Sequence, residues 1–214
     1  MTQFWLPVRC VICGEYPSSL CQRCEADLAL AGRKVSRDRL VPGLSCVQYS
    51  GAARELVLAF KQSGSRELAR LMARSMAEAL VGSAVSQPLL LIPAPSRRQS
   101  MVQRGFVPAA VLAGAVARCL QRSHGVSAAV VRVVKFVGSV ADQAGLNRVE
   151  RATNIAGQML CLRGPSGVES GRRLVLLDDV VTTGSTLSEL QRCLTASGWK
   201  PESFLTFAET LPKG

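Results

Sequence analysis

Short apolar runs alternate with segments of helical periodicity along most of this chain. The runs have the length of buried strands, and the longer segments repeat apolar residues three and four positions apart, as amphipathic helices do. This alternation predicts a doubly wound α/β fold, a mostly parallel sheet with helices on both faces. The predicted strands cover 46–50, 89–92, 130–134, 158–162, 172–177 and 203–207, and the predicted helices cover 51–80, broken at Ser63-Gly64, and 107–121.

The pattern differs before residue 46. Four closely spaced cysteines are followed there by a basic stretch, GRKVSRDRL. We therefore expect two parts, a cysteine module with its linker over 1–45 and an α/β domain over 46–214. The length of 214 residues, 48% of them hydrophobic, suits one full domain with a small appendage.

The segment 174–186, LVLLDDVVTTGST, carries the clearest chemical signal. An apolar strand runs directly into Asp178 and Asp179, and a loop rich in hydroxyl side chains follows before the next helical segment. Such a loop predicts a phosphate cradle at a helix N-terminus, with Gly184 allowing close approach of an anion to the backbone. The two carboxylates are placed to accept hydrogen bonds from ribose hydroxyls or to bind hydrated Mg²⁺.

Two other interpretations of this segment are less favoured. A core strand followed by an ordinary helix cap needs one hydroxyl and no paired aspartates. A nucleotide-binding P-loop needs a lysine before its Ser or Thr, and no lysine occurs between Lys135 and Lys200.

The segment resembles the phosphoribosyl pyrophosphate (PRPP) signature of type I phosphoribosyltransferases at every position. The resemblance implies that Asp178 and Asp179 hold the ribose hydroxyls and act as the catalytic pair, while the loop holds the 5′-phosphate. It also implies Mg²⁺ bound together with PRPP. The PRPP-binding residues expected from it are Asp178, Asp179, Val181, Thr182, Thr183, Gly184, Ser185 and Thr186.

A second turn is expected beside this loop. In a parallel sheet the turn after strand 89–92 lies at the same edge, so one turn can hold pyrophosphate while the other holds the 5′-phosphate. Arginines near that turn could neutralise a diphosphate leaving group, although each alone has a solvated surface charge as its alternative. The candidates are Pro93, Ala94, Arg97, Arg98 and Arg104. Segment 135–154 has the length of a closing loop, with Asp142, Gln143, Asn147, Arg148, Arg151 and Asn154 as candidate site residues.

The cysteines Cys10, Cys13, Cys21 and Cys24 have the spacing C-x2-C-x7-C-x2-C. Two such pairs supply four thiolates for a structural Zn²⁺. A disulfide pair and a redox C-x-x-C are the alternatives. The first residues, MTQFWLPVRC, lack the features of a secretory signal, so we expect a cytoplasmic protein, in which reducing conditions favour metal. Buried, inert thiols explain the remaining cysteines best: Cys46, Cys119, Cys161 and Cys193.

The net charge of +11 narrows the choice of partners. Most of the basic residues are arginine, which suits a polyphosphate substrate, a nucleic acid or both; a general compositional bias toward arginine is the alternative. No apolar run approaches the roughly 20 residues of a membrane helix, so we expect a soluble protein. The only histidine, His124, falls in a predicted turn and is not favoured as a general base.

Together these features resemble the ComF family over nearly the whole chain. Besides the cysteines and the PRPP signature, the similar elements are Phe4-Trp5-Leu6-Pro7, Ala59-Phe60-Lys61 with Gly64, Ile92-Pro93-Ala94-Pro95, Arg104-Gly105-Phe106, and the spaced Gln143, Leu146, Arg151 and Asn154. Two departures occur where an acceptor base or diphosphate would be held: Val107-Pro108 replaces Asn-Gln, and KFVGSVAD reduces a basic run. They weigh against conventional transferase activity more than against PRPP binding.

The ComF resemblance implies a link to natural competence and DNA uptake, with single-stranded DNA and proteins of the competence machinery as partners. A metabolic phosphoribosyltransferase acting on a nucleobase or related acceptor is the second hypothesis. A non-catalytic zinc-containing module that binds single-stranded nucleic acid through its basic surface is the third. Turnover and the identity of an acceptor stay open at this point.

Overall fold

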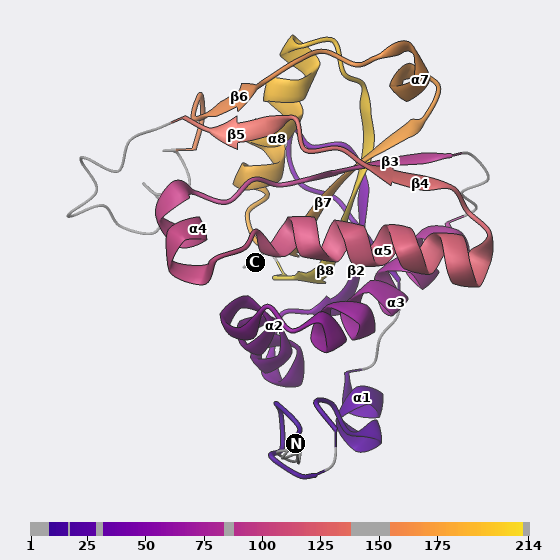
Figure 1. Ribbon diagram of the computed structural model, residues 1–214, viewed down its shortest axis with the longest axis vertical. Helices are drawn as coiled ribbons and strands as arrows, with labels where there is room; N and C mark the ends of the chain where they lie inside the picture. The colour runs from indigo at the N-terminus through magenta and orange to yellow at the C-terminus, as the bar shows by residue number, and fades with distance from the viewer. Residues whose placement is uncertain (1–8, 17, 29–31, 84–87, 138–154, 212–214) are drawn as a thin grey trace, which may run out of the picture.

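The computed structural model describes residues 9–16, 18–28, 32–83, 88–137 and 155–211 (Figure 1). Its strands are β1 (Arg33–Val35), β2 (Gly43–Gln48), β3 (Leu89–Pro93), β4 (Ala128–Val130), β5 (Val134–Phe136), β6 (Met159–Cys161), β7 (Arg173–Val181) and β8 (Pro201–Glu209). Its helices are α1 (Gln22–Asp27), α2 (Gly51–Ser63), α3 (Arg66–Gly82), α4 (Arg98–Arg104), α5 (Pro108–His124), α7 (Gly167–Ser170) and α8 (Ser185–Ala196).

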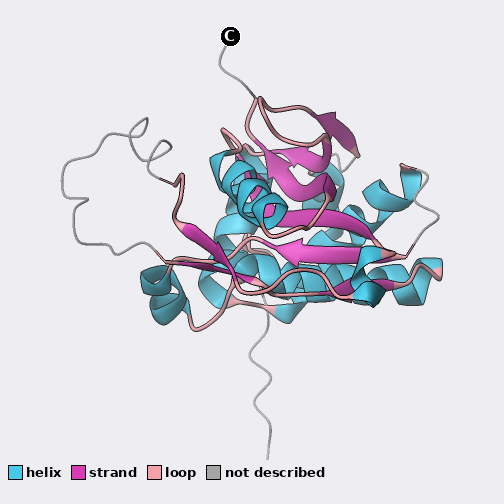
Figure 2. Ribbon diagram, turned by 90° about the horizontal axis from the view of Figure 1, so that it is seen from above, coloured by secondary structure: helices cyan, strands magenta, loops and turns pink. Residues whose placement is uncertain are grey.

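A six-stranded sheet in the order β1-β2-β8-β7-β3-β4 forms the centre of the fold. All neighbours pair in parallel except β1, which runs antiparallel to β2 at one edge. Helices α3 and α5 pack on one face and α8 on the other, and the two views show helices on both sides of the strands (Figure 1 and Figure 2). The predicted doubly wound, mostly parallel α/β fold is confirmed.

The central strands are covered on both faces, which is why they read as continuous apolar runs. Residues 89–92 of β3 and 174–177 of β7 are all 3% exposed or less. Helices α2 and α3 are divided at Gly64, which has a left-handed backbone (φ 62°), and Ser65 accepts a hydrogen bond from the N–H of Leu68 at the start of α3. The break predicted at Ser63-Gly64 is therefore confirmed.

The apolar run 130–134, predicted as one strand, is divided between two sheets. β4 ends at Val130 and pairs with β3. β5 begins at Val134 and pairs antiparallel with β6 in a separate two-stranded sheet. The run is apolar except for Arg132, and neither this arginine nor the valines beside it show where the chain leaves a sheet edge, so periodicity could not locate the change. Four short elements, α1, β1, α4 and α7, were also not predicted.

The sheet begins before residue 46, where the α/β domain was expected to start. β1 and the first half of β2 lie within the stretch assigned to the linker, and both strands are hydrogen-bonded parts of the main sheet. The cysteine module also packs on the domain. Leu20 and Leu28 join the common apolar core, and the Ser19 hydroxyl donates to Glu67 of α3 at 2.5 Å.

Among the described residues, none of the helices taken singly combines the length and the apolar character of a membrane span. Helices α4 and α5 meet that criterion only as a pair, with a bend of 71° between them. The apolar face of α5, with Leu112, Val116 and Leu120, is buried in the core of the fold, as is usual for a core helix.

Candidate functional site

The carboxyl ends of β3 and β7 lie side by side. Ile92 is in register with Leu176 and Pro93 with Leu177, and the pairing extends one residue further, where Ala94 N–H donates to the Leu177 carbonyl at 2.8 Å. The turn after β3 and the loop after β7 therefore meet at one edge of the sheet, as the sequence predicted.

The paired aspartates occupy the end of β7 and have different surroundings. Successive side chains of a strand point to opposite faces. Asp179 is 6% exposed, and its Oδ1 lies 2.7 Å from Nζ of Lys61 in α2. Asp178 is half-buried on the other face, where its Oδ1 accepts a hydrogen bond from Asp179 N–H at 2.9 Å. One aspartate is thus already paired with a cation, and the other has spare accepting capacity.

These surroundings shift the pKa values of the site. Burial, reinforced by the neighbouring Asp179 charge, raises the pKa of Asp178 to about 7, although Lys61 and the Asp179 N–H oppose the rise. Burial alone would lower the pKa of Lys61, but the Asp179 and Asp178 carboxylates outweigh it and the pKa of Lys61 is raised. Lys61 is therefore a permanent cation, and Asp178 carries a proton more readily than an ordinary aspartate.

The loop after β7 forms an open helix N-terminus. Thr182 and Thr183 are exposed, Gly184 is buried with a φ of 86°, and α8 begins at Ser185. The hydroxyls of Thr183 and Ser185 are 2.7 Å apart. The first-turn N–H groups of a helix lack intrahelical partners and favour an anion. The residues predicted as a phosphate cradle, Thr182, Thr183, Gly184, Ser185 and Thr186, thus lie at a helix N-terminus, and phosphate binding there stays a prediction.

Arg37, which lies between β1 and β2 and supports this loop, was not predicted from the sequence. Its Nε donates to the Thr182 carbonyl at 3.1 Å, and its Nη2 donates to Glu209 Oε2 at 3.1 Å and to the Thr210 carbonyl at 2.7 Å. The Cβ that alanine would place at Gly184 would lie 3.3 Å from Arg37 Cβ. Gly184 is therefore in close contact with the Arg37 side chain, while the predicted approach of an anion to its backbone stays a prediction. No feature of GRKVSRDRL distinguishes this arginine from its neighbours.

The turn after β3 holds its predicted residues in unequal positions. Pro93 and Ala94 are buried, and neither has a backbone N–H for an anion, because proline lacks one and that of Ala94 is used within the sheet. Arg97 precedes α4, with its guanidinium carbon 5.6 Å from the centre of the Phe136 ring in β5. Arg98 and Arg104 are exposed on α4. The structure thus places the arginines beyond β3 and gives Arg97 a contact to the small sheet.

The small sheet of β5 and β6 is attached to α8. Glu189 of α8 is 4% exposed; its Oε1 accepts the Met159 N–H of β6 at 3.2 Å, and Arg192 donates to both of its oxygens. The predicted closing loop, 135–154, lies between β5 and β6 except for Lys135 and Phe136, which the structure places in β5. Its candidate residues Asp142, Gln143, Leu146, Asn147, Arg148, Arg151 and Asn154 lie outside the described residues.

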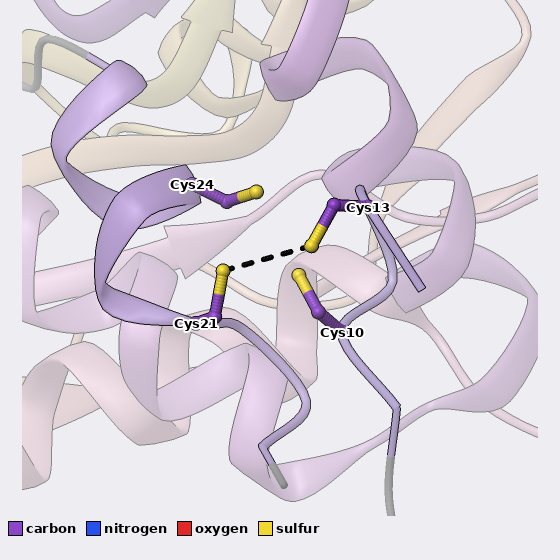
Figure 3. Close-up of side chains that lie close together, drawn as sticks. All are labelled: Cys10, Cys13, Cys21 and Cys24. Atoms are coloured by element: carbon purple, nitrogen blue, oxygen red, sulfur yellow. Dashed lines mark hydrogen bonds between the residues drawn. The ribbon is translucent and has the colours of Figure 1, made fainter. Parts of the chain in front are cut away.

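The four cysteines of the N-terminal module converge on one point (Figure 3). Their sulfur atoms all lie within 4.8 Å of one another, and those of Cys13 and Cys21 are 3.7 Å apart. Four sulfurs bound tetrahedrally at about 2.3 Å from Zn²⁺ are about 3.8 Å from each other. The donor set and its spacing therefore fit a tetrahedral metal ion, as the sequence predicted.

Local backbone structure holds the thiols in this arrangement. Gly14 has a φ of 77°, and its N–H donates to the Cys10 carbonyl at 2.9 Å, which closes a tight turn. Burial would raise the pKa of Cys10, but the N–H groups of Cys13, Cys21 and Ile12 lower it to about 6. Burial and the neighbouring thiols raise the pKa of Cys24. Four thiols this close cannot all ionise without a cation between them.

Cys46 lies apart from this cluster. It is 1% exposed, and burial, with the nearby charge of Glu78, raises its pKa to about 12. A thiol of this kind is inert toward metals and oxidants. Of the other cysteines outside the cluster, Cys193 is buried, and Cys119 and Cys161 are half-buried.

The mostly parallel sheet, strand β7 with its aspartates and loop, and the N-terminal cysteine cluster define an α/β protein with an appended four-cysteine module. No family model matches the chain. Over 133 residues the chain is 30% identical to Competence protein F of Haemophilus influenzae, a match that covers 62% of this chain and 56% of that protein. The chain thus spans about half the length of this curated relative. The similarity confirms the resemblance to the ComF family.

Solved structures give fainter likenesses. A hypoxanthine phosphoribosyltransferase from Staphylococcus aureus aligns with a TM-score of 0.37 at 11% identity, over 70% of this chain and 76% of that one. A protein from Thermus thermophilus aligns with a TM-score of 0.36 at 18% identity, over 68% and 85% of the two chains. These likenesses are too faint to bear on the site.

Proposed function

We propose that this chain is a ComF-type protein that binds PRPP with Mg²⁺ at the carboxyl edge of β3 and β7. One observation carries the proposal. The paired aspartates Asp178 and Asp179 lead directly into a glycine-containing loop at the open N-terminus of α8. A ribose with a 5′-phosphate needs carboxylate acceptors for its hydroxyls and, close to them, a phosphate cradle, and this strand and loop offer the two side by side.

Each part of PRPP has a partner in this proposal. The loop from Val181 to Thr186 holds the 5′-phosphate through N–H groups and hydroxyls. Asp178 accepts a hydrogen bond from a ribose hydroxyl. Lys61, already beside Asp179, adds positive charge for the phosphates. Bound Mg²⁺ would neutralise diphosphate oxygens, which are ligands that it prefers.

A transfer reaction at this site would have a simple balance. A nucleophile on the acceptor forms a bond to the anomeric carbon of ribose, and the bond from that carbon to pyrophosphate breaks with its electron pair leaving on the diphosphate. Arg97, Arg98 and Arg104 are the cations nearest in sequence to the β3 turn for stabilising that charge. The engaged N–H of Ala94 means that the diphosphate must be held by other donors of the turn. The proposal therefore has two separate parts: binding of PRPP, and catalytic turnover of the bound PRPP.

We assign the four-cysteine cluster to a structural Zn²⁺. Four thiolates with no open ligand position are typical of a structural site. Because Leu20 and Leu28 beside the cluster join the core of the α/β domain, metal binding would also hold the module against that domain.

Natural competence is the proposed biological setting. The relative named Competence protein F supports it, and the net charge of +11 supports single-stranded DNA as a partner. Binding of single-stranded DNA should then weaken steeply as salt rises. Salt-dependent DNA binding without any PRPP binding would favour the non-catalytic module instead.

Calorimetric titration with PRPP and Mg²⁺ tests the site directly. We expect micromolar binding by the zinc-loaded wild type and its loss in an Asp178→Asn/Asp179→Asn variant. Asp38→Asn is the matched control, because the side chain of Asp38 is 93% exposed. The Asp179→Asn change leaves Lys61 without its ion-pair partner. Thermal unfolding of each variant checks that the protein is still folded. Failure of a folded wild type to bind would overturn the proposal.

A further inference from the structure

We infer that Arg37 orients a phosphate-binding N–H group of the loop after β7, so that this arginine positions the loop for its anion. The inference rests on the proposed function, because it names how the same site is held. Arg37 is outside the PRPP signature and precedes it by more than a hundred residues. Its side chain is only 10% exposed, which is rare for an arginine without a structural task.

The geometry of the peptide between Thr182 and Thr183 gives Arg37 its effect. The Thr182 carbonyl accepts a hydrogen bond from Arg37 Nε at 3.1 Å. In a trans peptide the carbonyl and the following N–H point in opposite directions. The Thr183 N–H is therefore directed away from the Arg37 guanidinium, and Thr182 and Thr183 are both exposed, so an anion can reach this stretch of the loop. Without this bond the peptide is free to turn and to present an oxygen to the anion.

The guanidinium is itself held firmly. Glu209, 7% exposed in its side chain, pairs with Arg37 Nη2 at 3.1 Å and is in register with Val181 at the end of β7. Thr210 accepts a second bond from Nη2 through its carbonyl and donates its N–H to the Val181 carbonyl at 2.9 Å. A planar fork with five donors can satisfy all of these acceptors at once, whereas a lysine ammonium cannot.

The stretch around Arg37 is also fixed to α8, the helix that completes the cradle. Gln191 of α8 accepts the Val41 N–H at 2.8 Å and donates to the Arg39 carbonyl at 3.3 Å. The Arg37 stem lies against Gly184, where an added Cβ would approach it to 3.3 Å. The segment from Arg37 to Val41 therefore contacts both the loop after β7 and helix α8.

The test uses a variant that removes the bond to Thr182 without leaving a buried charge. Arg37→Met alone would leave the buried Glu209 carboxylate without its cation, so we combine it with Glu209→Gln. Arg39→Met is the control, since the Arg39 side chain is 91% exposed and contacts Asp38. Calorimetry with PRPP and Mg²⁺, and separately with inorganic phosphate, measures affinity. The ¹⁵N amide signal of Thr183 reports whether that N–H meets the anion.

We expect the Arg37→Met/Glu209→Gln protein to melt near the wild-type temperature, yet to bind either probe about 10- to 100-fold more weakly, the worth of one charge-assisted hydrogen bond. The Thr183 signal should shift with ligand in the wild type and in Arg39→Met but hardly in the double variant. Arg37→Lys should recover only part of the affinity. Wild-type affinity and a wild-type Thr183 response in the folded double variant would overturn the inference.

Failure of the proposed function gives a different result. If the wild type binds inorganic phosphate but not PRPP, the PRPP proposal falls, and the same phosphate titration still decides the role of Arg37. If the wild type binds neither probe, both fall.

Discussion

Nζ of Lys61 lies 2.7 Å from Oδ1 of Asp179, so a residue of α2 neutralises one aspartate of the signature at the end of β7. The Lys61 side chain is 27% exposed and the Asp179 side chain 9%. The pair joins a helix from early in the chain to a strand from late in it. In the sequence, Ala59-Phe60-Lys61 was noted only as a resemblance. The structure shows that Lys61 of this element forms an ion pair with Asp179.

Lys61→Met should destabilise the protein by about 3 kcal/mol, because it leaves the Asp179 carboxylate buried without its cation. The free energy of unfolding in urea measures the loss. Adding Asp179→Asn to Lys61→Met should recover much of it. Arg74→Met is the control: its pair with Glu78 is more than half exposed on both sides, and we expect a change below about 0.5 kcal/mol. Equal losses for the lysine and the arginine variants would contradict the assignment.

Asp178→Asn should change how stability depends on pH. Burial raises the pKa of Asp178 to about 7, against about 3.9 in an unfolded chain. The native state therefore binds this proton more tightly, so the contribution of the group to stability is complete below about pH 4 and declines as pH rises toward 7. The free energy of unfolding of Asp178→Asn should therefore increase relative to that of the wild type as pH rises across that range. Urea unfolding at about pH 5 and about pH 7.5 checks the direction.

Glu169 provides a control of opposite sign for that experiment. Its ion pair with Arg163 lowers the pKa of Glu169 to about 2. Its contribution to stability is therefore present above about pH 4 and is lost as pH falls toward 2. Glu169→Gln should leave the slope between the same two pH values as it is in the wild type.

Removal of metal from the cysteine module should lower the melting temperature by about 10 °C, because the module shares its core with the α/β domain. Chelation and Cys24→Ser should give the same result, with zinc content falling in both. Cys119→Ser is the matched control, since Cys119 is half-buried and outside the cluster. A chelator-treated protein that melts like the untreated one would rule out the structural metal.

Gly184→Ala should cost about 1–2 kcal/mol of stability through its left-handed backbone, and more because the new Cβ meets Arg37. Gly125→Ala is the control, with a left-handed backbone at φ 67° in open space. The difference in unfolding free energy between the two variants isolates the contact with Arg37. PRPP affinity should fall for the Gly184 variant only.

The central strands and the helices α2, α3 and α5 could be predicted because their signals are local. Apolar runs, helical spacing and the glycine at position 64 all act within a few residues. The division of 130–134 between two sheets was not predictable, because it depends on which distant strand each half meets. The early start of the sheet was missed for a different reason: β1 is three residues long, RKV, with two basic side chains exposed, so no apolar run marks it.

The candidate site divides along a similar line. The signature from Asp178 to Thr186 and the four cysteines were recognisable because their chemistry is compact in sequence. Arg37 and Glu189 were not, since each acts through a backbone group that only the folded chain brings near. The only histidine, predicted in a turn after a helix, is instead the last residue of the helix: His124 ends α5 just before β4 begins, at the edge of the sheet opposite the aspartates.

The strand order has a consequence for how the molecule comes to be made. β2 emerges early from a ribosome, but its parallel neighbour β8 follows every other described strand. Arg37 likewise waits for Glu209, 172 residues later. Contacts of such long range form slowly, so β2, paired with β1 on one side, has an unpaired second edge until β8 has been made. The last strand closes the middle of the sheet and supports the loop after β7 in the same event.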